Sequence, residues 1–385
     1  MVIATGGVET LHQSKLKGGK MQNKAYLQWK KDIFKQAKER KTPIFGQFEL
    51  TGRCNLNCKM CYVHNLNAAD CLARELSTEE WKRIFDEACA QELLFATLTG
   101  GECLLRPDFR ELYLYLWKRG VKVTVYTNGV LLDQEYITFF KTYKPETIQI
   151  SLYGSDESGY INVTEHRGFE KTVAAIRGLM EAKVNVRVVT TPNHYMGDDY
   201  IKILRFCKEQ GFPLQLGELI LVPNRDNPEK KDYFLTMDKI KELAIERTLL
   251  YRELTPREHT PEPCGPMLHS PRKGLTCNAG ACLACVMWDG VMYPCPNAMV
   301  GGGASLREMS YADAWKHTVE AASQVIQGVE CEGCAYDAVC PKCPTLRLTG
   351  LTTGHCNPAV CEMSRHLAAA GVHKLEDKIE GGCND

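Results

Sequence analysis

Short apolar runs alternate with amphipathic segments from residue 43 to residue 221, and this alternation predicts both strands and helices. The helices are opened by recognisable signals, such as Ser77 followed three residues later by Glu80, which is a capping box. Strands separated by helices build a parallel sheet with right-handed crossovers. The fold class is therefore α/β, and a partial, TIM-like (β/α)6 barrel fits better than an open sheet, although the pattern alone leaves both possible. The predicted strands are 43–50, 94–98, 121–126, 147–152, 184–190 and 214–221, and the predicted helices are 78–92, 107–119, 169–182 and 200–210.

The pattern changes after the last of these strands. Residues 226–263 are polar and rich in proline and charge, with one predicted helix at 236–254, and they form a linker or a lid. Residues 264–385 contain short strands, glycines and many cysteines, so this small domain needs metal to fold. The predicted organisation is an N-terminal extension over 1–44, whose first twenty residues are a disordered lead-in, a barrel over 45–225, the linker, and the cysteine-rich domain.

Charge and hydropathy exclude several classes of partner. The 385 residues include 47 basic and 47 acidic side chains, so no basic surplus favours nucleic acid. No apolar run approaches the roughly 18 residues that a membrane helix needs. The N-terminus lacks the apolar core of a secretion signal, and we expect a cytoplasmic protein without nucleic-acid or membrane partners.

Cysteine is the unusual component, with 19 residues in the chain. Disulfides need an oxidising compartment, whereas thiolate-bound metal sites suit a reducing one. Because the cysteines form tight pairs and triplets and no export signal is present, metal is favoured over disulfides.

The most specific motif contains Cys54, Cys58 and Cys61, spaced CxxxCxxC directly after a predicted strand. Three thiolates on one loop can hold three irons of a cubane cluster and leave the fourth iron open. The alternative is a zinc loop without its fourth ligand. The segment resembles the signature of the radical S-adenosylmethionine (SAM) superfamily. The resemblance implies that SAM chelates the open iron, and that an electron donor such as flavodoxin or ferredoxin drives its cleavage to a hydrogen-abstracting 5′-deoxyadenosyl radical.

The same resemblance implies which residues meet SAM. The GGE turn of Gly100, Gly101 and Glu102 contacts the methionine amino group, and Ser151, at a strand end, contacts ribose or carboxylate. Arg167 or Arg187 is a candidate partner of the carboxylate. Met60 and Tyr62 flank the adenine. Cys103 follows the turn and is a candidate catalytic residue, as hydrogen donor or substrate tether, although a tolerated small residue is the simpler interpretation.

The C-terminal cysteines carry a second resemblance. Asp289-Gly290 lies between apolar residues and predicts a hairpin that brings Cys277 and Cys295 together at its base. The whole pattern resembles the SPASM domain, which holds two auxiliary four-iron clusters in peptide-modifying radical enzymes. Carried over to this chain, the first cluster uses Cys277, Cys295, Cys343 and Cys264, and the second uses Cys331, Cys334, Cys340 and Cys361.

Two departures leave this ligand assignment open. Only Pro341 and Lys342 separate Cys340 from Cys343, where the family has three residues. Cys264 also lies further upstream of Cys277 than its counterpart in the family does. The fourth ligand of the first cluster is therefore uncertain. A zinc-ribbon-like module is the alternative. Three further cysteines lie among the ligands and could replace one of them: Cys282, Cys285 and Cys356.

The resemblances predict a radical SAM enzyme that abstracts hydrogen from a peptide and leads to a crosslink, a thioether or an epimerised residue. The stretch before Phe45 is too short for the roughly 80-residue recognition domain of many such enzymes, which weakens the peptide hypothesis or requires a separate recognition protein. The alternative is a small-molecule epimerase or dehydrogenase acting on a sugar or an aminocyclitol. An electron carrier is disfavoured, because a carrier gains nothing from an open iron.

Overall fold

The computed structural model describes most of the barrel and about half of the remainder of the chain. The described residues are 19–61, 69–216, 232–236, 238–240, 242–243, 272–275, 277–327, 334–336, 340, 343, 345 and 354–369. Most of the predicted linker, the second half of the sixth predicted strand and most of the helix expected at 236–254 lie outside them, although 238–240 and 242–243 are helical.

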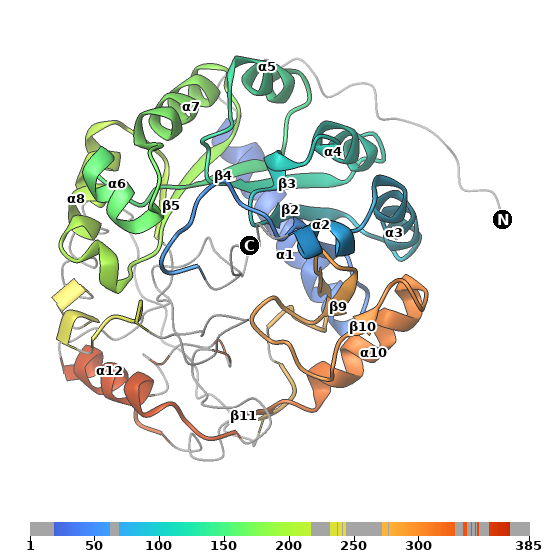
Figure 1. The fold of residues 1–385 in the computed structure, drawn as a ribbon. Helices are drawn as coiled ribbons and strands as arrows, with labels where there is room; N and C mark the ends of the chain where they lie inside the picture. The colour runs from blue at the N-terminus through green and yellow to red at the C-terminus, as the bar shows by residue number, and fades with distance from the viewer. Residues whose placement is uncertain are drawn as a thin grey trace.

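Six parallel strands form the barrel sheet, in the order in which they occur along the chain (Figure 1). This arrangement confirms the predicted partial (β/α)6 barrel. The strands are β1 (Phe45–Thr51), β2 (Phe95–Gly100), β3 (Lys122–Thr127), β4 (Thr147–Ser151), β5 (Val186–Thr190) and β6 (Leu214–Leu216).

Helices cover the convex side of this sheet, outside the arc of strands (Figure 1). They are α3 (Thr78–Ala90), α4 (Phe109–Trp117), α5 (Gln134–Thr142), α6 (Glu157–Thr164), α7 (Phe169–Glu181) and α8 (Asp199–Glu209), with short 3-10 turns at Cys103–Leu105 and His194–Met196. The short helix α2 (Ala69–Arg74) lies instead beside the segment that follows β1. The predicted capping box of α3 is confirmed, since Ser77 and Glu80 bond each other's backbone. The short helices α5 and α6 were not predicted, because each offers only two turns of periodic signal.

Alternate strand residues face the two sides of the sheet, as the pleat requires. Ile148 and Ile150 of β4, with Val188 of β5, belong to the buried core that packs against the helices. The residues between them face the concave side, where Gln149 pairs in register with Arg187. The concave side is thus polar, and it is the side on which a bound molecule would find hydrogen-bonding groups.

The cysteine-rich region continues the barrel sheet instead of forming a separate layer. Strand β8 (Leu283–Val286) pairs in parallel with the outer edge of β1, and β9 (Val291–Tyr293) pairs antiparallel with β8. The hairpin predicted at Asp289-Gly290 is confirmed, with Gly290 at φ 91°. Its docking on β1 could not be predicted, because no pattern in either strand identifies the other. The remaining described elements are β7 (Arg272–Lys273), β10 (Ala304–Ser305), α10 (Tyr311–Ser323), β11 (Ile326–Gln327) and α12 (Pro358–Ala369).

The N-terminal extension contains a helix that the sequence pattern did not predict. Helix α1 (Gly19–Arg40) packs against the first residues of β1 and β2: the ring of Phe34 lies 6.2 Å from that of Phe45 and 5.2 Å from that of Phe95. Ala37 has no exposed surface. Most α1 residues are polar, so its narrow apolar face was not recognised. The helix covers the barrel end opposite the cysteine loop.

Among the described residues, no helix combines the length and the apolar character needed to cross a bilayer.

We expect Phe34→Ala to weaken the attachment of α1. Removing a half-buried ring should lower the free energy of unfolding by about 2 kcal/mol, less than for a fully buried phenylalanine. The urea midpoint of the variant measures this loss. Lys31→Ala, an exposed position on the same helix, is the control and should change stability by less than about 0.5 kcal/mol. Equal midpoints for the two variants would contradict the packing role of α1.

Candidate active site

The predicted cluster cysteines lie on one loop that begins where β1 ends. The backbone N–H of Asn57 donates to the carbonyl of Thr164 at 3.0 Å, and that of Lys59 donates to Val163 O, also at 3.0 Å. The loop is therefore fixed against the C-terminal turn of α6. All three cysteines are half-buried: Cys54, Cys58 and Cys61.

Burial raises the pKa of two of these thiols, Cys54 and Cys58, and the neighbouring thiolates add to the rise. Burial raises the pKa of Cys54 to about 12, and burial followed by the charges of Cys61 and Cys54 raises the pKa of Cys58 well above its ordinary value. Without metal, Cys54 and Cys58 would be protonated at neutral pH, because burial and neighbouring charge disfavour their thiolates. A positively charged iron core removes this cost, because thiolates are its natural ligands. The loop therefore fits an iron–sulfur cluster.

A single metal ion fits this loop less well. Within the described part of the chain, no three Cys, His, Asp or Glu side chains converge closely enough to hold one ion. A cubane cluster spreads its thiolates over separate corners and tolerates wider spacing. The zinc alternative thus gains no support from the geometry.

The two glycines of the GGE turn are needed because the turn lies against the cysteine loop. A Cβ on Gly100, which has φ 135°, would lie 2.3 Å from Thr51 O, and one on Gly101 would lie 2.2 Å from Arg53 O. The N–H of Gly101 donates to Thr51 O at 2.8 Å. Any side chain here would push the turn off the loop.

Glu102 is fully buried and ties the ends of two strands together. Its carboxylate accepts hydrogen bonds from the N–H of Leu104 at 3.1 Å and that of Asn128 at 2.8 Å, and from Thr127 Oγ1 at 2.9 Å. Burial raises its pKa, and these donors oppose the rise. Asn128 also places its side-chain Nδ2 3.8 Å from Cys54 Sγ. The acid expected to contact SAM thus also holds the turn in place.

Cys103 lies inside the protein, with no exposed surface. Its thiol donates to the carbonyl of Tyr126 at 3.3 Å. Burial, and then the charge of Glu102, raise its pKa well above the ordinary value. A protonated thiol enclosed in this way has no free path to a substrate.

The remaining predicted SAM residues lie in different settings. Met60 is buried, Ser151 is half-buried at the end of β4, and Arg167 is exposed in the loop after α6. Arg187 lies on the concave face of β5 and donates to Gln215 Oε1 at 3.2 Å. Tyr62 lies outside the described residues.

Sequence reasoning missed a charged cluster behind the cysteine loop. The carboxylate of Glu75 accepts from Thr51 Oγ1 at 2.5 Å and from Arg53 Nε and Nη2 at 3.0 and 3.1 Å. Burial alone would raise the pKa of Glu75, but hydrogen bonds from Arg53 and Thr51 outweigh it and lower the pKa, so Glu75 is ionised. Arg106 lies 3.9 Å from Glu75 and is paired with Asp108 at 2.6 Å. The polar residues before Cys54 were visible in the sequence, but their partner was not.

The C-terminal hairpin holds this same segment from the other side. The N–H of Leu76 donates to Trp288 O at 3.0 Å, and the guanidinium of Arg74 stacks 4.9 Å from the Trp288 ring centre. A Cβ on Gly52 would lie 3.1 Å from Trp288. Residues 74–76 therefore connect the cysteine loop to the hairpin.

The predicted auxiliary ligands that the structure describes differ in their exposure. Cys277 is exposed, and Cys264 and Cys331 lie outside the described part of the chain. The half-buried ones are Cys295, Cys334, Cys340, Cys343 and Cys361. Cys282 and Cys285 have no exposed surface, and Cys282 packs beside Ala37, Ile44 and Phe95. These two thus serve the packing of β8 on the barrel.

Comparison with known families identifies the domain that contains the cysteine loop. Residues 48–230 match the model of the Radical SAM superfamily. The chain carries a radical SAM domain. This result confirms the predicted family, whose members are enzymes that cleave SAM with an iron–sulfur cluster.

The radical SAM chain is similar to several characterised proteins. It is 26% identical to the AdoMet-dependent heme synthase of Methanosarcina barkeri, over 78% of this chain and 91% of that protein. It is 27% identical to the mycofactocin maturase MftC of Mycolicibacterium smegmatis, over 72% of this chain and 71% of that protein. It is 29% identical to the sporulation killing factor maturation protein SkfB of Bacillus subtilis, over 47% of this chain and 43% of that protein.

The fold also resembles that of solved structures. Streptococcus suis SuiB bound to its precursor peptide SuiA superposes with a TM-score of 0.60 at 16% identity, covering 89% of this chain and 79% of SuiB. At this identity the likeness concerns the fold, and it extends beyond the barrel into the C-terminal region.

We expect Glu75→Gln to loosen the cysteine loop, because the variant keeps the shape but leaves Arg53 without a charge partner. Breaking a buried pair should cost about 3 kcal/mol of stability, and small displacements of reacting groups should lower SAM cleavage by roughly tenfold or more. Released 5′-deoxyadenosine and the iron content measure the effect. Glu135→Gln, which breaks an exposed pair with Arg110, is the control and should leave both unchanged. Equal rates in the two variants would contradict a positioning role for Glu75.

Cys103→Ala should keep SAM cleavage and most product formation, because the thiol is enclosed and bonded to a carbonyl. Removing the buried sulfur should cost about 1 kcal/mol of stability. Product and 5′-deoxyadenosine are quantified together in one reaction. Loss of product with undiminished 5′-deoxyadenosine would instead make Cys103 a direct participant.

Proposed function

We propose that this radical SAM enzyme modifies a peptide by abstracting hydrogen from it, and that its product is a crosslinked, thioether-containing or epimerised residue. Two observations support a peptide substrate. Relatives reported above are a maturase and a maturation protein, and the fold is shared with a protein solved with a precursor peptide. The similarity to MftC carries the proposal, because it spans most of both chains.

Different residues of the barrel would bind the iron–sulfur cluster and SAM. The thiolates of Cys54, Cys58 and Cys61 would hold three irons of the cluster, and Asn128 would donate to the first of them. When bound, the cluster and SAM supply the hydrogen-abstracting radical. Gly100 and Gly101 let the turn lie directly against the cysteine loop, which would place its backbone beside the cluster and SAM.

The concave face would hold the rest of SAM. Ser151 ends β4 and would bond ribose or carboxylate. For the carboxylate, Arg187 is preferred over Arg167, because Arg187 lies on the concave face, whereas Arg167 lies in an exposed loop. Met60 and Tyr62 would flank the adenine.

The C-terminal cysteines would hold two auxiliary clusters. We further propose an electron donor such as flavodoxin or ferredoxin, a separate peptide-recognition protein, and a reducing, cytoplasmic setting for this oxidoreductase.

A second candidate substrate is a tetrapyrrole. The AdoMet-dependent heme synthase is matched over more of its own length than MftC is, so a porphyrin-type substrate has a specific observation in its favour. The sugar or aminocyclitol alternative stays a prediction.

The protein reconstituted without oxygen should bind about twelve irons in three clusters. Replacing Cys54, Cys58 and Cys61 together by alanine should remove about four irons and abolish 5′-deoxyadenosine. Zinc in place of iron in the purified protein would overturn the proposal.

Mass spectrometry separates the substrates. A short peptide encoded beside the enzyme is co-expressed with the intact and with the triple-alanine protein, and a mass change only with the intact enzyme supports the peptide. A mass change on an iron porphyrin incubated with SAM and reductant, and none on the peptide, would favour the tetrapyrrole.

A further inference from the structure

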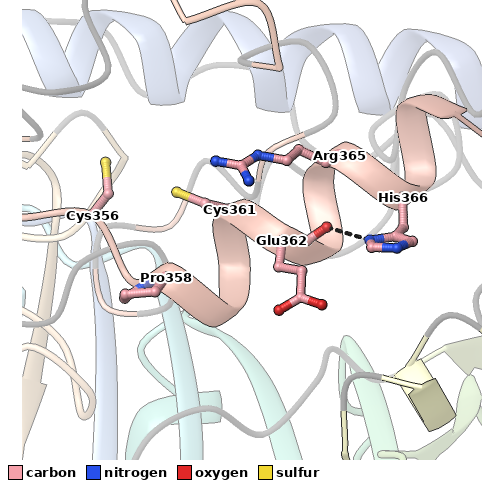
Figure 2. A pocket seen from close by; sticks show the side chains of 6 residues that line it. All are labelled: Cys356, Pro358, Cys361, Glu362, Arg365 and His366. Atoms are coloured by element: carbon pink, nitrogen blue, oxygen red, sulfur yellow. Dashed lines mark hydrogen bonds between the residues drawn. The ribbon is translucent and has the colours of Figure 1, made fainter.

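The C-terminal helix α12 forms one wall of a cavity of about 610 Å³ (Figure 2). Two cysteines, one arginine and one histidine reach it from this helix and from the turn before it. The lining residues are Cys356, Pro358, Cys361, Glu362, Arg365 and His366.

The start of α12 brings two thiols to the same cavity. Pro358 is the first helical residue, and the N–H of Cys361 donates to Asn357 O at 3.0 Å, which fixes the first turn. Cys356 lies just before this turn. Figure 2 shows the sulfurs of Cys356 and Cys361 on the same side of the cavity.

Arg365 brings positive charge to these thiols. It lies one turn after Cys361, on the same face of α12, and Figure 2 shows its guanidinium directed toward the side of the cavity where the sulfurs lie. A cluster bound by four thiolates is an anion, and a neighbouring arginine offsets its charge and can donate to its sulfurs.

A single zinc ion explains the cavity less well. His366 Nδ1 is 2.8 Å from the carbonyl of Glu362, so that nitrogen is already engaged, and the Glu362 carboxylate points away from the sulfurs in Figure 2. Within the described residues no three metal-binding side chains converge on one ion.

The short spacing between Cys340 and Cys343 suggests that Cys356 is needed as a cluster ligand. Only Pro341 and Lys342 separate Cys340 from Cys343, and a CxxC pair readily places both thiolates on one cluster. If both serve the first auxiliary cluster, the second cluster lacks a ligand. Cys356 lines the same cavity as Cys361, which the resemblance to SPASM domains assigns to that cluster.

We propose that Cys356 and Cys361 are both ligands of the second auxiliary cluster, in the cavity beside α12, and that Arg365 is a positioning residue that faces this cluster. The inference rests on the proposed function, because it requires auxiliary clusters. Cys356 then replaces Cys340, and the first cluster gains the ligand that the sequence left open.

The experiment isolates the auxiliary clusters. In the full chain with Cys54, Cys58 and Cys61 replaced by alanine, anaerobic reconstitution should leave about eight irons. In this background Cys356→Ala and Cys361→Ala should each lower the count to about four and remove the same electron paramagnetic resonance signal of the reduced protein. Cys207→Ala, a buried cysteine of α8, is the control and should keep both.

Folding and ligation are separated in two ways. The metal-free Cys356→Ala protein should melt at the temperature of the metal-free background, which excludes general unfolding as the cause of iron loss. Arg365→Gln, an exposed position, should keep about eight irons but shift the midpoint potential of that one signal to more negative values, since lost positive charge disfavours reduction.

Two results would overturn the inference, and they are distinct. If Cys356→Ala keeps all the iron and both signals while Cys361→Ala loses one, Cys356 is not a ligand and the proposed function stands. If the triple-alanine background binds no iron at all, the auxiliary clusters themselves are absent, and that part of the proposed function fails with the inference.

Discussion

Strand β1 is hydrogen-bonded on both edges, and the rest of the structure depends on this pairing. On one edge Thr51 pairs with Gly100 of β2, which brings the end of β1 beside the GGE turn. On the other edge Phe45 to Phe48 pair with β8 of the cysteine-rich region. The cysteine loop follows β1 directly, so its position is set by both neighbours. A shift of β1 by one residue would reverse the faces of its side chains and displace the loop from the glycine turn.

Charge compensation is the second constraint on the site. The thiols of the cysteine loop are half-buried and repel one another as thiolates, so the loop is stable in the charged form only around a cationic iron core. Behind the loop no metal is needed for charge compensation. There the carboxylates of Glu75 and Asp108 are neutralised by the guanidinium groups of Arg53 and Arg106. The loop is thus held by a protein ion network on one side and completed by the cluster on the other.

Much of this could be predicted from the sequence, for identifiable reasons. The barrel strands have strong local patterns, and CxxxCxxC is a local motif whose chemistry follows from its spacing. The Asp289-Gly290 hairpin was predicted because its turn chemistry is also local. By contrast, the partner of Arg53 is Glu75 and the neighbour of Gly52 is Trp288, and these contacts depend on tertiary packing. Helix α1 was missed because its apolar face is narrow. The burial of Cys103 was missed because a position after a turn does not reveal which way the side chain points.

The pairing of β8 with β1 also has a consequence for biosynthesis. Leu283 reaches its partner Phe45 only after the entire barrel has left the ribosome. Until then the outer edge of β1 exposes unpaired N–H and C=O groups, which can pair with another chain. Contacts between segments so distant in sequence also form slowly. The strand that leads into the cysteine loop is therefore prone to aggregation until β8 is made, and chaperones that shield it during this period would increase the yield of folded protein.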